Sequence, residues 1–301
     1  MLWQSKAVAG EPMRLSSTAF ATMLFFTALY GQQVDSRHHF MPKALVKHQA
    51  GSATVIANDP RPLFQAITAV REEYGWAVNY EDPPYFRKYD LVDDTDPQWR
   101  AAHPGSKGVT IPAGGFFQSS YPEGQIIYTA SGEEEVLRKI VSDCNRTNNP
   151  GKFRVLRNGN GSFSVIGISS RNANGNLQNV IPILETRISL PNSKRSGAQT
   201  VNLILIVLSA RLGKTVVLGT MAVNLMMQAQ IEIGGDNVSA RSLLVQMLDA
   251  VSAWFFQATG HALQLLYDVN YDGDDNCYSL GIFGAERPNH VPIVPIVPGP
   301  R

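Results

Sequence analysis

The chain has 301 residues, of which 44% are hydrophobic, 9% aromatic and 17% charged, and its formal net charge is +1. The length suits one large domain or two ordinary ones with a packed core, and the composition excludes a chain that is disordered throughout. The near-neutral charge offers no basic surface for nucleic acid, and two cysteines are too few for a disulfide scaffold or a four-cysteine zinc site.

Residues 1–31 are predicted to be a secretory signal peptide. Lys6 and Arg14 supply positive charge, and a mostly apolar run follows over residues 19–29 before small and polar residues take over. The run is too short to cross a hydrocarbon core of about 30 Å as a helix. We therefore expect a periplasmic or secreted protein with no transmembrane span in the mature chain. The alternatives are a start at Met13, or an N-terminal helix that is buried or anchors the chain in a membrane.

Residues 44–168 are predicted to form a first module of helices and strands. The first helix ends at Gly75, and the second opens with a capping box made by Ser131 and Glu134. Residues 81–108, acidic and punctuated by prolines, are expected to be a loop insertion. Apolar residues at helical spacing give the two helices buried faces: Leu63, Ile67, Val70 and Tyr74, then Val136, Leu137, Ile140, Val141 and Cys144. Strands are predicted at residues 53–57, 76–80, 116–121, 153–157 and 163–168.

Residues 169–183 are rich in Asn, Ser and Gly and are predicted to be a linker, and residues 184–285 form a second module. Its first helix opens with a capping box of Ser196 and Gln199 and ends at Gly213. The apolar faces of its helices are Leu203, Ile204, Val207, Leu208 and Leu212, then Leu243, Leu244, Met247, Leu248 and Val251. Strands are predicted at residues 184–190, 214–218, 227–233, 263–269 and 278–282, with turns at 234–237 and 272–273.

Both halves share one order of elements, which is strand, helix, strand, strand, helix, strand, strand. The predicted fold class is therefore α+β, with two tandem βαββαββ modules that have small mixed sheets and helices on one face. Residues 286–301 read as a Pro-rich tail, because repeated prolines favour polyproline II and forbid a helix.

Five segments of the second half carry the pattern of a known family: residues 188–190, 213–218, 229–233, 242–248 and 263–267. Together they resemble the short N-terminal domain shared by secretins and TonB-dependent receptors, and the first half matches it more loosely. The resemblance implies a non-catalytic periplasmic interaction or scaffolding module with an envelope protein as partner. Such modules stack in rings in secretins or contact a signalling partner in receptors.

Acidic and aromatic residues gather at the start of the loop insertion. Long loops on compact domains often carry function. Candidate partner or ligand contacts are therefore Trp76, Tyr80, Glu81, Asp82, Tyr85 and Trp99. Because paired carboxylates near aromatic rings also suit a glycan cleft, the alternative function is a secreted glycan-binding protein or hydrolase that uses the acidic aromatic loop 80–99. A solvated surface loop without function is the simpler interpretation.

A partial calcium motif stands near the C-terminal end of the second module. Asp268, Asn270, Asp272 and Gly273 match the first half of an EF-hand loop. However, Ser279 stands where the bidentate Glu belongs, and the flanking segments read as strands. The pattern indicates a polar hairpin turn that binds calcium weakly at most, and we predict no metal or other cofactor.

Gly213, Lys214 and Thr215 end like a Walker A loop, but they follow a helix where that motif follows a strand, so they indicate a helix stop. Cys144 and Cys277 fall in different modules and are expected to be free thiols. The alternative is a disulfide formed in an oxidising compartment.

Overall fold

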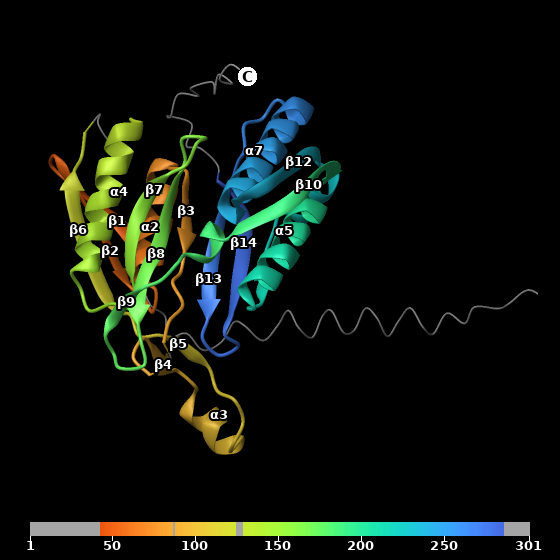
Figure 1. The fold of residues 1–301 in the computed structure, drawn as a ribbon. Coiled ribbons are helices and arrows are strands. Elements are labelled where there is room, and N and C mark those ends of the chain that lie inside the picture. The colour runs from red at the N-terminus through yellow and green to blue at the C-terminus, as the bar shows by residue number, and fades with distance from the viewer. Residues whose placement is uncertain (1–42, 87, 125–128, 286–301) are drawn as a thin grey trace, which may run out of the picture. The chain divides into compact units, whose positions relative to one another are not determined.

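The computed structural model of the chain describes residues 43–86, 88–124 and 129–285 (Figure 1). The expected signal peptide 1–31 and the Pro-rich tail 286–301 lie outside these residues. The predicted α+β class is confirmed, since helices and strands alternate along the chain and the strands form small sheets. Within the described residues, no helix is both long enough and apolar enough to cross a membrane.

The first half contains the predicted alternation of strands and helices. Its main elements are β1 (Leu45–Gln49), β2 (Ser52–Asn58), α2 (Pro62–Tyr74), β3 (Val78–Glu81), β6 (Phe116–Pro122), α4 (Ala130–Asn145), β7 (Lys152–Arg157) and β8 (Phe163–Arg171). The predicted helix faces are confirmed, because all nine of their residues are buried. The second helix begins at a different cap, because the Thr129 side chain, and not that of Ser131, accepts the Gly132 N–H.

The insertion after β3 has more regular structure than the expected loop. It contains β4 (Leu91–Asp93) and α3 (Pro97–Ala102), and β4 pairs with β5 (Thr110–Pro112). The Asp96 carboxylate caps α3 by accepting the Trp99 N–H at 2.7 Å, and Pro97 occupies the first turn. These elements are too short for a helical or strand periodicity to be recognised in the sequence. Only the capping residues Asp96 and Pro97 indicate the helix α3.

The second half repeats the order of the first. Its elements are η2 (Ile183–Glu185), β10 (Arg187–Ser196), α5 (Gly197–Leu212), β11 (Val216–Leu218), α6 (Val223–Gln228), β12 (Gln230–Ser239), α7 (Ala240–Thr259), β13 (Gln264–Asp272) and β14 (Cys277–Ala285). The capping box of Ser196 and Gln199 is present, and Gly213 ends α5 with a φ of 62°. Gly213 and Lys214 are therefore a helix stop, as expected.

Three local predictions in this half are wrong. A 3-10 turn, η2, occupies residues 183–185 where a strand was expected, and α6 takes the start of the strand expected at residues 227–233. The expected turn at residues 234–237 lies inside β12. Gly234 is needed there for close approach, because a Cβ at this position would lie 2.4 Å from the Asn192 backbone of β10.

The two halves have the same strand pairing. Strand β1, which pairs with β2, and the insertion strands β4 and β5 belong to the first half alone. Without them, the first and third strands of each half pair antiparallel, as β2 with β6 and β10 with β12. The second and last strands pair parallel, as β3 with β8 and β11 with β14, and the last two strands form a hairpin in both halves. In each half the two helices lie against this mixed sheet and build a separate hydrophobic core. The structure is therefore an internal repeat of one topology.

The halves are joined through one seven-stranded sheet in the order β11-β14-β13-β3-β8-β7, with β9 (Leu177–Asn179) paired to β8. The junction is the parallel pairing of β3 with β13. Residues 169–183, expected to be a linker, include the end of β8 and all of β9. Polar composition is typical of linkers, but backbone pairing does not depend on side chains, so this stretch extends the sheet.

The helices of the two halves cover opposite faces of the shared sheet. Val78 and Tyr80 of β3 lie in the first-half core, whereas Tyr267 and Val269 of β13 lie in the second-half core. Tyr80 pairs with Asp268, which stands between those two β13 residues, so alternation places the two cores on opposite sides.

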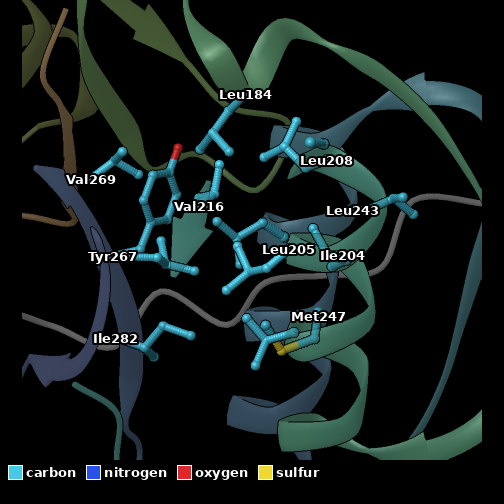
Figure 2. Close-up of a cluster of buried hydrophobic side chains, with 14 of the residues drawn as sticks. Leu184, Ile204, Leu205, Leu208, Val216, Leu243, Met247, Tyr267, Val269 and Ile282 are labelled. Atoms are coloured by element: carbon cyan, nitrogen blue, oxygen red, sulfur yellow. The ribbon is translucent and has the colours of Figure 1, made fainter. Parts of the chain in front are cut away.

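Side chains from both helices of the second half pack against β11, β13 and β14. Figure 2 shows this core, with the buried residues Leu184, Ile204, Leu205, Leu208, Val216, Leu243, Met247, Tyr267, Val269 and Ile282 labelled.

Candidate functional site at the junction of the two halves

The acidic aromatic residues that were predicted to contact a partner lie mainly inside the protein. Five of the six are buried: Trp76, Tyr80, Glu81, Asp82 and Tyr85. Trp99 is half-buried on α3, where its ring stacks on His103 with ring centroids 4.6 Å apart. The five buried side chains are therefore not available to a partner in this conformation. The physical reason is that the acids are neutralised by arginines that are distant in sequence.

Glu81 is held by an arginine from the other half. Arg241 on α7 donates from Nε to Glu81 Oε1 at 2.7 Å and from Nη2 to Oε2 at 2.8 Å, and its Nη1 binds Glu185. The Tyr267 hydroxyl also donates to Glu81, at 2.7 Å. Burial opposes the Arg241 charge, but the hydrogen bonds and charge of Glu81 outweigh burial and raise the Arg241 pKa. This charge-assisted pair joins β3 to α7.

Asp82 forms a second contact across the junction. Its carboxylate accepts Arg61 Nε at 2.8 Å and the hydroxyls of Tyr80 and Tyr85 at 2.8 and 2.7 Å. It also accepts the backbone N–H of Tyr271 on β13 at 3.1 Å. Burial, followed by the nearby Asp82 charge, raises the pKa of both tyrosines well above the ordinary value, so both hydroxyls remain donors.

A second arginine–carboxylate pair crosses the junction, on the face of the sheet opposite the Glu81–Arg241 pair. Arg71 on α2 contacts Asp268 on β13 through both Nη atoms, at 3.1 and 2.5 Å, and its Nε donates to Val78 O at 2.6 Å. Burial raises the pKa of Asp268, while Arg71 opposes that rise. Together the two crossing pairs and the hydrogen bond from Tyr271 to Asp82 connect α2 and β3 of the first half to α7 and β13 of the second.

The residues of the partial calcium motif make other contacts in the structure. Asp268 binds Arg71, and Asp272 accepts the backbone N–H groups of Asp274 and Asp275, at 2.7 and 3.2 Å. Asp268, Asn270 and Asp272 all lie on strand β13 and not in a loop. The described residues hold no group of three or more His, Cys, Asp or Glu side chains arranged to bind a metal. The hairpin instead holds the insertion, because Asp274 accepts the Thr110 N–H at 2.9 Å.

Two further acids of the loop insertion are also paired with arginines. Asp90 is fully buried and binds Arg171 at 2.7 Å, and the exposed Asp93 binds Arg100. A hydrolase needs one protonated and one ionised carboxyl facing a cleft. Asp82 and Asp90 instead meet arginines in the interior, which argues against a catalytic pair in the stretch 80–99.

A pocket of about 570 Å³ lies beside the Arg241 cluster, between the β7–β8 hairpin and the first turns of α7. Asp249 lines it and accepts the Asn160 side-chain N–H at 2.8 Å, and burial raises the Asp249 pKa. Glu185 also lines the pocket and is held by Arg241. Sequence reasoning missed this pocket, although the charged Arg241 at the start of an apolar helix is a signal that could have found it.

A second concave surface of about 340 Å³ lies along the outer edge of the sheet, between α4 and β7. Three of its lining residues are the arginines Arg138, Arg146 and Arg154, and Val141, Phe153 and Val155 form its apolar part. We call this surface the α4–β7 groove. Sequence reasoning also missed it, because its residues come from separate elements.

The chain was compared with protein-family models, with curated proteins and with solved structures, and none of the three comparisons found a match.

Proposed function

We propose that the protein is a non-catalytic interaction or scaffolding protein of the periplasm or cell envelope, of the kind represented by the short N-terminal domains of secretins and TonB-dependent receptors. The observation that carries this proposal is the repeat, in which both halves have the same strand pairing and a helix pair on a small mixed sheet. A helix pair on such a sheet in the second half is what the resemblance requires.

The chemistry of the interior supports the same proposal. Glu81, Asp82 and Asp268 are buried at the junction and each binds an arginine, so these acids help to hold the two halves together. Charged side chains used in this way position modules relative to one another and are not available for general acid–base work. The exposed surfaces, and above all the α4–β7 groove, are then the places where a partner binds.

The test is photo-crosslinking in the cell envelope combined with a substrate screen. A photoreactive amino acid is placed at Arg154, at the edge of the groove, and at the exposed Lys47 as a control. We expect one stoichiometric envelope partner from the first position and no turnover of cell-wall or plant polysaccharides by the purified protein. Hydrolysis that is lost in an Asp249→Asn variant would contradict the non-catalytic proposal and favour an enzyme that uses the pocket.

Export is tested separately, by sequencing the N-terminus of the protein recovered from the periplasm. We expect the mature chain to begin close to residue 32. Recovery of the intact chain from the cytoplasm would contradict the proposed localisation.

A further inference from the structure

β7 is the outer strand of the seven-stranded sheet and runs beside α4 (Figure 1). In the described part of the chain it pairs only with β8. The Asn145 side chain accepts the Phe153 N–H at 2.9 Å and donates to its carbonyl at 2.8 Å, so the backbone of Phe153 faces away from β8. Because this orientation repeats every second residue, the N–H and C=O of Val155 and Arg157 face the same open edge.

The internal repeat identifies the matching edge in the second half. Val155 pairs with Val165 of β8, which pairs with Tyr80 of β3. In the same way Val269 pairs with Leu280 of β14, which pairs with Leu218 of β11. Val155 and Val269 therefore occupy the same place in their modules.

In the second half this edge is already occupied, by β3 of the first half. Asp82 donates its backbone N–H to Val269 O at 2.8 Å, and the Tyr267 N–H donates to the Asn79 side chain at 3.0 Å. Glu81, which pairs with Val269, reaches Arg241 on the helix beside that strand. In this chain, therefore, the acidic strand β3 already pairs in parallel with the β13 edge, which is the equivalent of the open β7 edge.

The open edge of the first half has the features of that occupied edge. Asn145 of α4 already satisfies the N–H and C=O of Phe153, whereas in the second half it is Asn79 of the added strand β3 that satisfies the Tyr267 N–H. In the first half, pairing with an added strand is therefore expected to begin at Val155. Arg138 and Arg146 lie on the helix beside the strand, and Arg154 lies on the strand itself. The three arginines are exposed, and they pair at present with half-buried acids, namely Glu134 at 2.6 Å, Asp143, and Glu185 at 3.7 Å. Because solvent screens the exposed arginines, these ion pairs are weak, and an incoming carboxylate competes for the arginines.

We propose that the α4–β7 groove binds an extended, acidic segment of an envelope partner, which adds to the sheet parallel to β7. This inference rests on the proposed interaction function, and it defines the partner by its chemistry. A residue opposite Val155 faces α4 and meets Arg138 or Arg146, and a residue opposite Arg154 faces the other side of the sheet. The segment therefore carries carboxylates at successive positions, as Glu81 and Asp82 do in β3.

A second copy of this chain is a poor occupant. The equivalent of β3 in the second half is β11, whose residues Val216, Val217 and Leu218 carry no charge. The Ser209 hydroxyl also closes that edge, because it accepts the Val216 N–H at 3.0 Å. The strand that would have to enter the groove is therefore short, neutral and partly capped.

The test is fluorescence anisotropy with the purified full chain and a labelled peptide that copies residues 76–82. We expect binding that weakens with added salt and falls about tenfold when Arg138→Glu and Arg146→Glu are combined. The charge-matched control combines Lys47→Glu and Arg211→Glu, at exposed positions outside the groove, and we expect it to bind like the wild type.

The strand-addition geometry is tested with a second peptide, N-methylated at the residue that copies Asp82. It keeps every charge but lacks the N–H that donates to the strand edge, so we expect a further loss of about fivefold or more. Hydrogen exchange of the Val155 amide should slow only with the unmethylated peptide.

Three results overturn the proposal: no binding, equal binding of the two peptides, or equal binding by the arginine variants. Concentration-dependent dimerisation that is lost in the arginine variants would instead identify a second copy as the occupant and also overturn it. If the groove fails these tests but envelope crosslinks map to another face of the protein, the proposed interaction function still holds. Polysaccharide turnover would contradict that function without affecting peptide binding to the groove.

Discussion

Single residues show most clearly how this protein uses its charges. The side chains of Glu81 and Arg241 are 2% and 4% exposed, and each is the main partner of the other. Removing one member of such a pair destabilises the fold much more than replacing both members with apolar residues, because the remaining charge stays buried without a partner. The acids at the start of the insertion therefore matter for stability, and their effect on any binding activity is indirect.

We expect Glu81→Gln to lower the free energy of unfolding by about 3 kcal/mol, because the Arg241 charge loses its ionised partner. Urea unfolding at neutral pH measures the change. The double variant Glu81→Leu with Arg241→Met should lose less than the single variant, since both charges are gone. The matched surface change, Glu134→Gln, removes an exposed pair and should cost about 0.5 kcal/mol or less. Equal losses in the buried and exposed variants would contradict this account.

His48 gives the first half a pH-dependent contact. Its ring nitrogens lie 2.6 Å from Glu123 and 3.1 Å from Glu73, and the hydrogen bond to Glu123 raises the His48 pKa above 6.5 against a small effect of burial. A raised pKa stabilises the fold below the unfolded value, and this stabilisation is lost as the pH rises through the folded value. Because the ring is largely exposed, the contribution is under about 1 kcal/mol.

An NMR titration tests this contact. The His48 pKa should exceed 6.5 in the wild type and fall towards it in Glu123→Gln. A His48 pKa that does not change in this variant would contradict the assignment.

The two thiols should differ in reactivity. Burial raises the pKa of Cys144 on α4 to about 11, whereas Cys277 is only half-buried. We expect iodoacetamide at pH 8 to label Cys277 in the native protein and Cys144 only after unfolding, because the thiolate is the reactive form. Mass spectrometry of the labelled peptides measures this. A Cys144–Cys277 disulfide in the protein isolated from the periplasm would overturn the expectation.

At the scale of elements, helix ends were the most predictable features and short elements the least. The capping box of Ser196 and Gln199 and the glycine that ends α5 are local signals, and both are present in the structure. The helix α3 and the strands β4 and β5 were missed, because a few residues do not establish a period. The start of α4 was misplaced by two residues, since Thr129 and Ser131 are both good capping residues by type.

The cap of α4 can be tested with a matched pair of variants. Thr129→Ala should lower the free energy of unfolding by about 1 kcal/mol, because the Gly132 N–H loses its acceptor. Ser131→Ala, which was the predicted cap, should change it by less than about 0.5 kcal/mol. Chemical denaturation of the two variants measures the difference. A larger loss in Ser131→Ala would contradict the observed cap.

At the scale of the whole molecule, the shared sheet makes the two modules depend on each other. The β3–β13 pairing and two arginine–carboxylate pairs cross the junction, and Arg61 and Asp82 of the first half both hydrogen-bond to the Tyr271 backbone of the second. We therefore expect residues 43–171 and 180–285, expressed as separate chains in one cell, to copurify as a complex. Arg241→Ala in the second piece should weaken that complex, and the two pieces purified apart should unfold at lower urea concentration than the intact chain. Independent pieces with unchanged stability would contradict this dependence.

Local spacing was sufficient to predict the α+β class, the buried faces of α2, α4 and α7, two hairpins and the repeated order of the long elements, whereas in the predicted face of α5 only Ile204 and Leu208 are fully buried. Each of these depends on residues a few positions apart, whose periodicity or turn chemistry is written in the chain itself. The sites depended on the tertiary structure. An acidic, aromatic stretch has the composition of a surface loop, and only the fold brings Arg241 to Glu81 across 160 residues and buries them together.

The α4–β7 groove could not be predicted for the same reason, because it also depends on contacts between distant residues. Whether a strand lies at the edge or the centre of a sheet is decided by which distant strand pairs with it, and no local pattern distinguishes β7 from β13. The sequence by itself determined the four long helices, most of the long strands and their order. The tertiary structure decided which charges are buried, which sheet edge is occupied and which remains open, because burial and strand pairing are properties of contacts between distant residues.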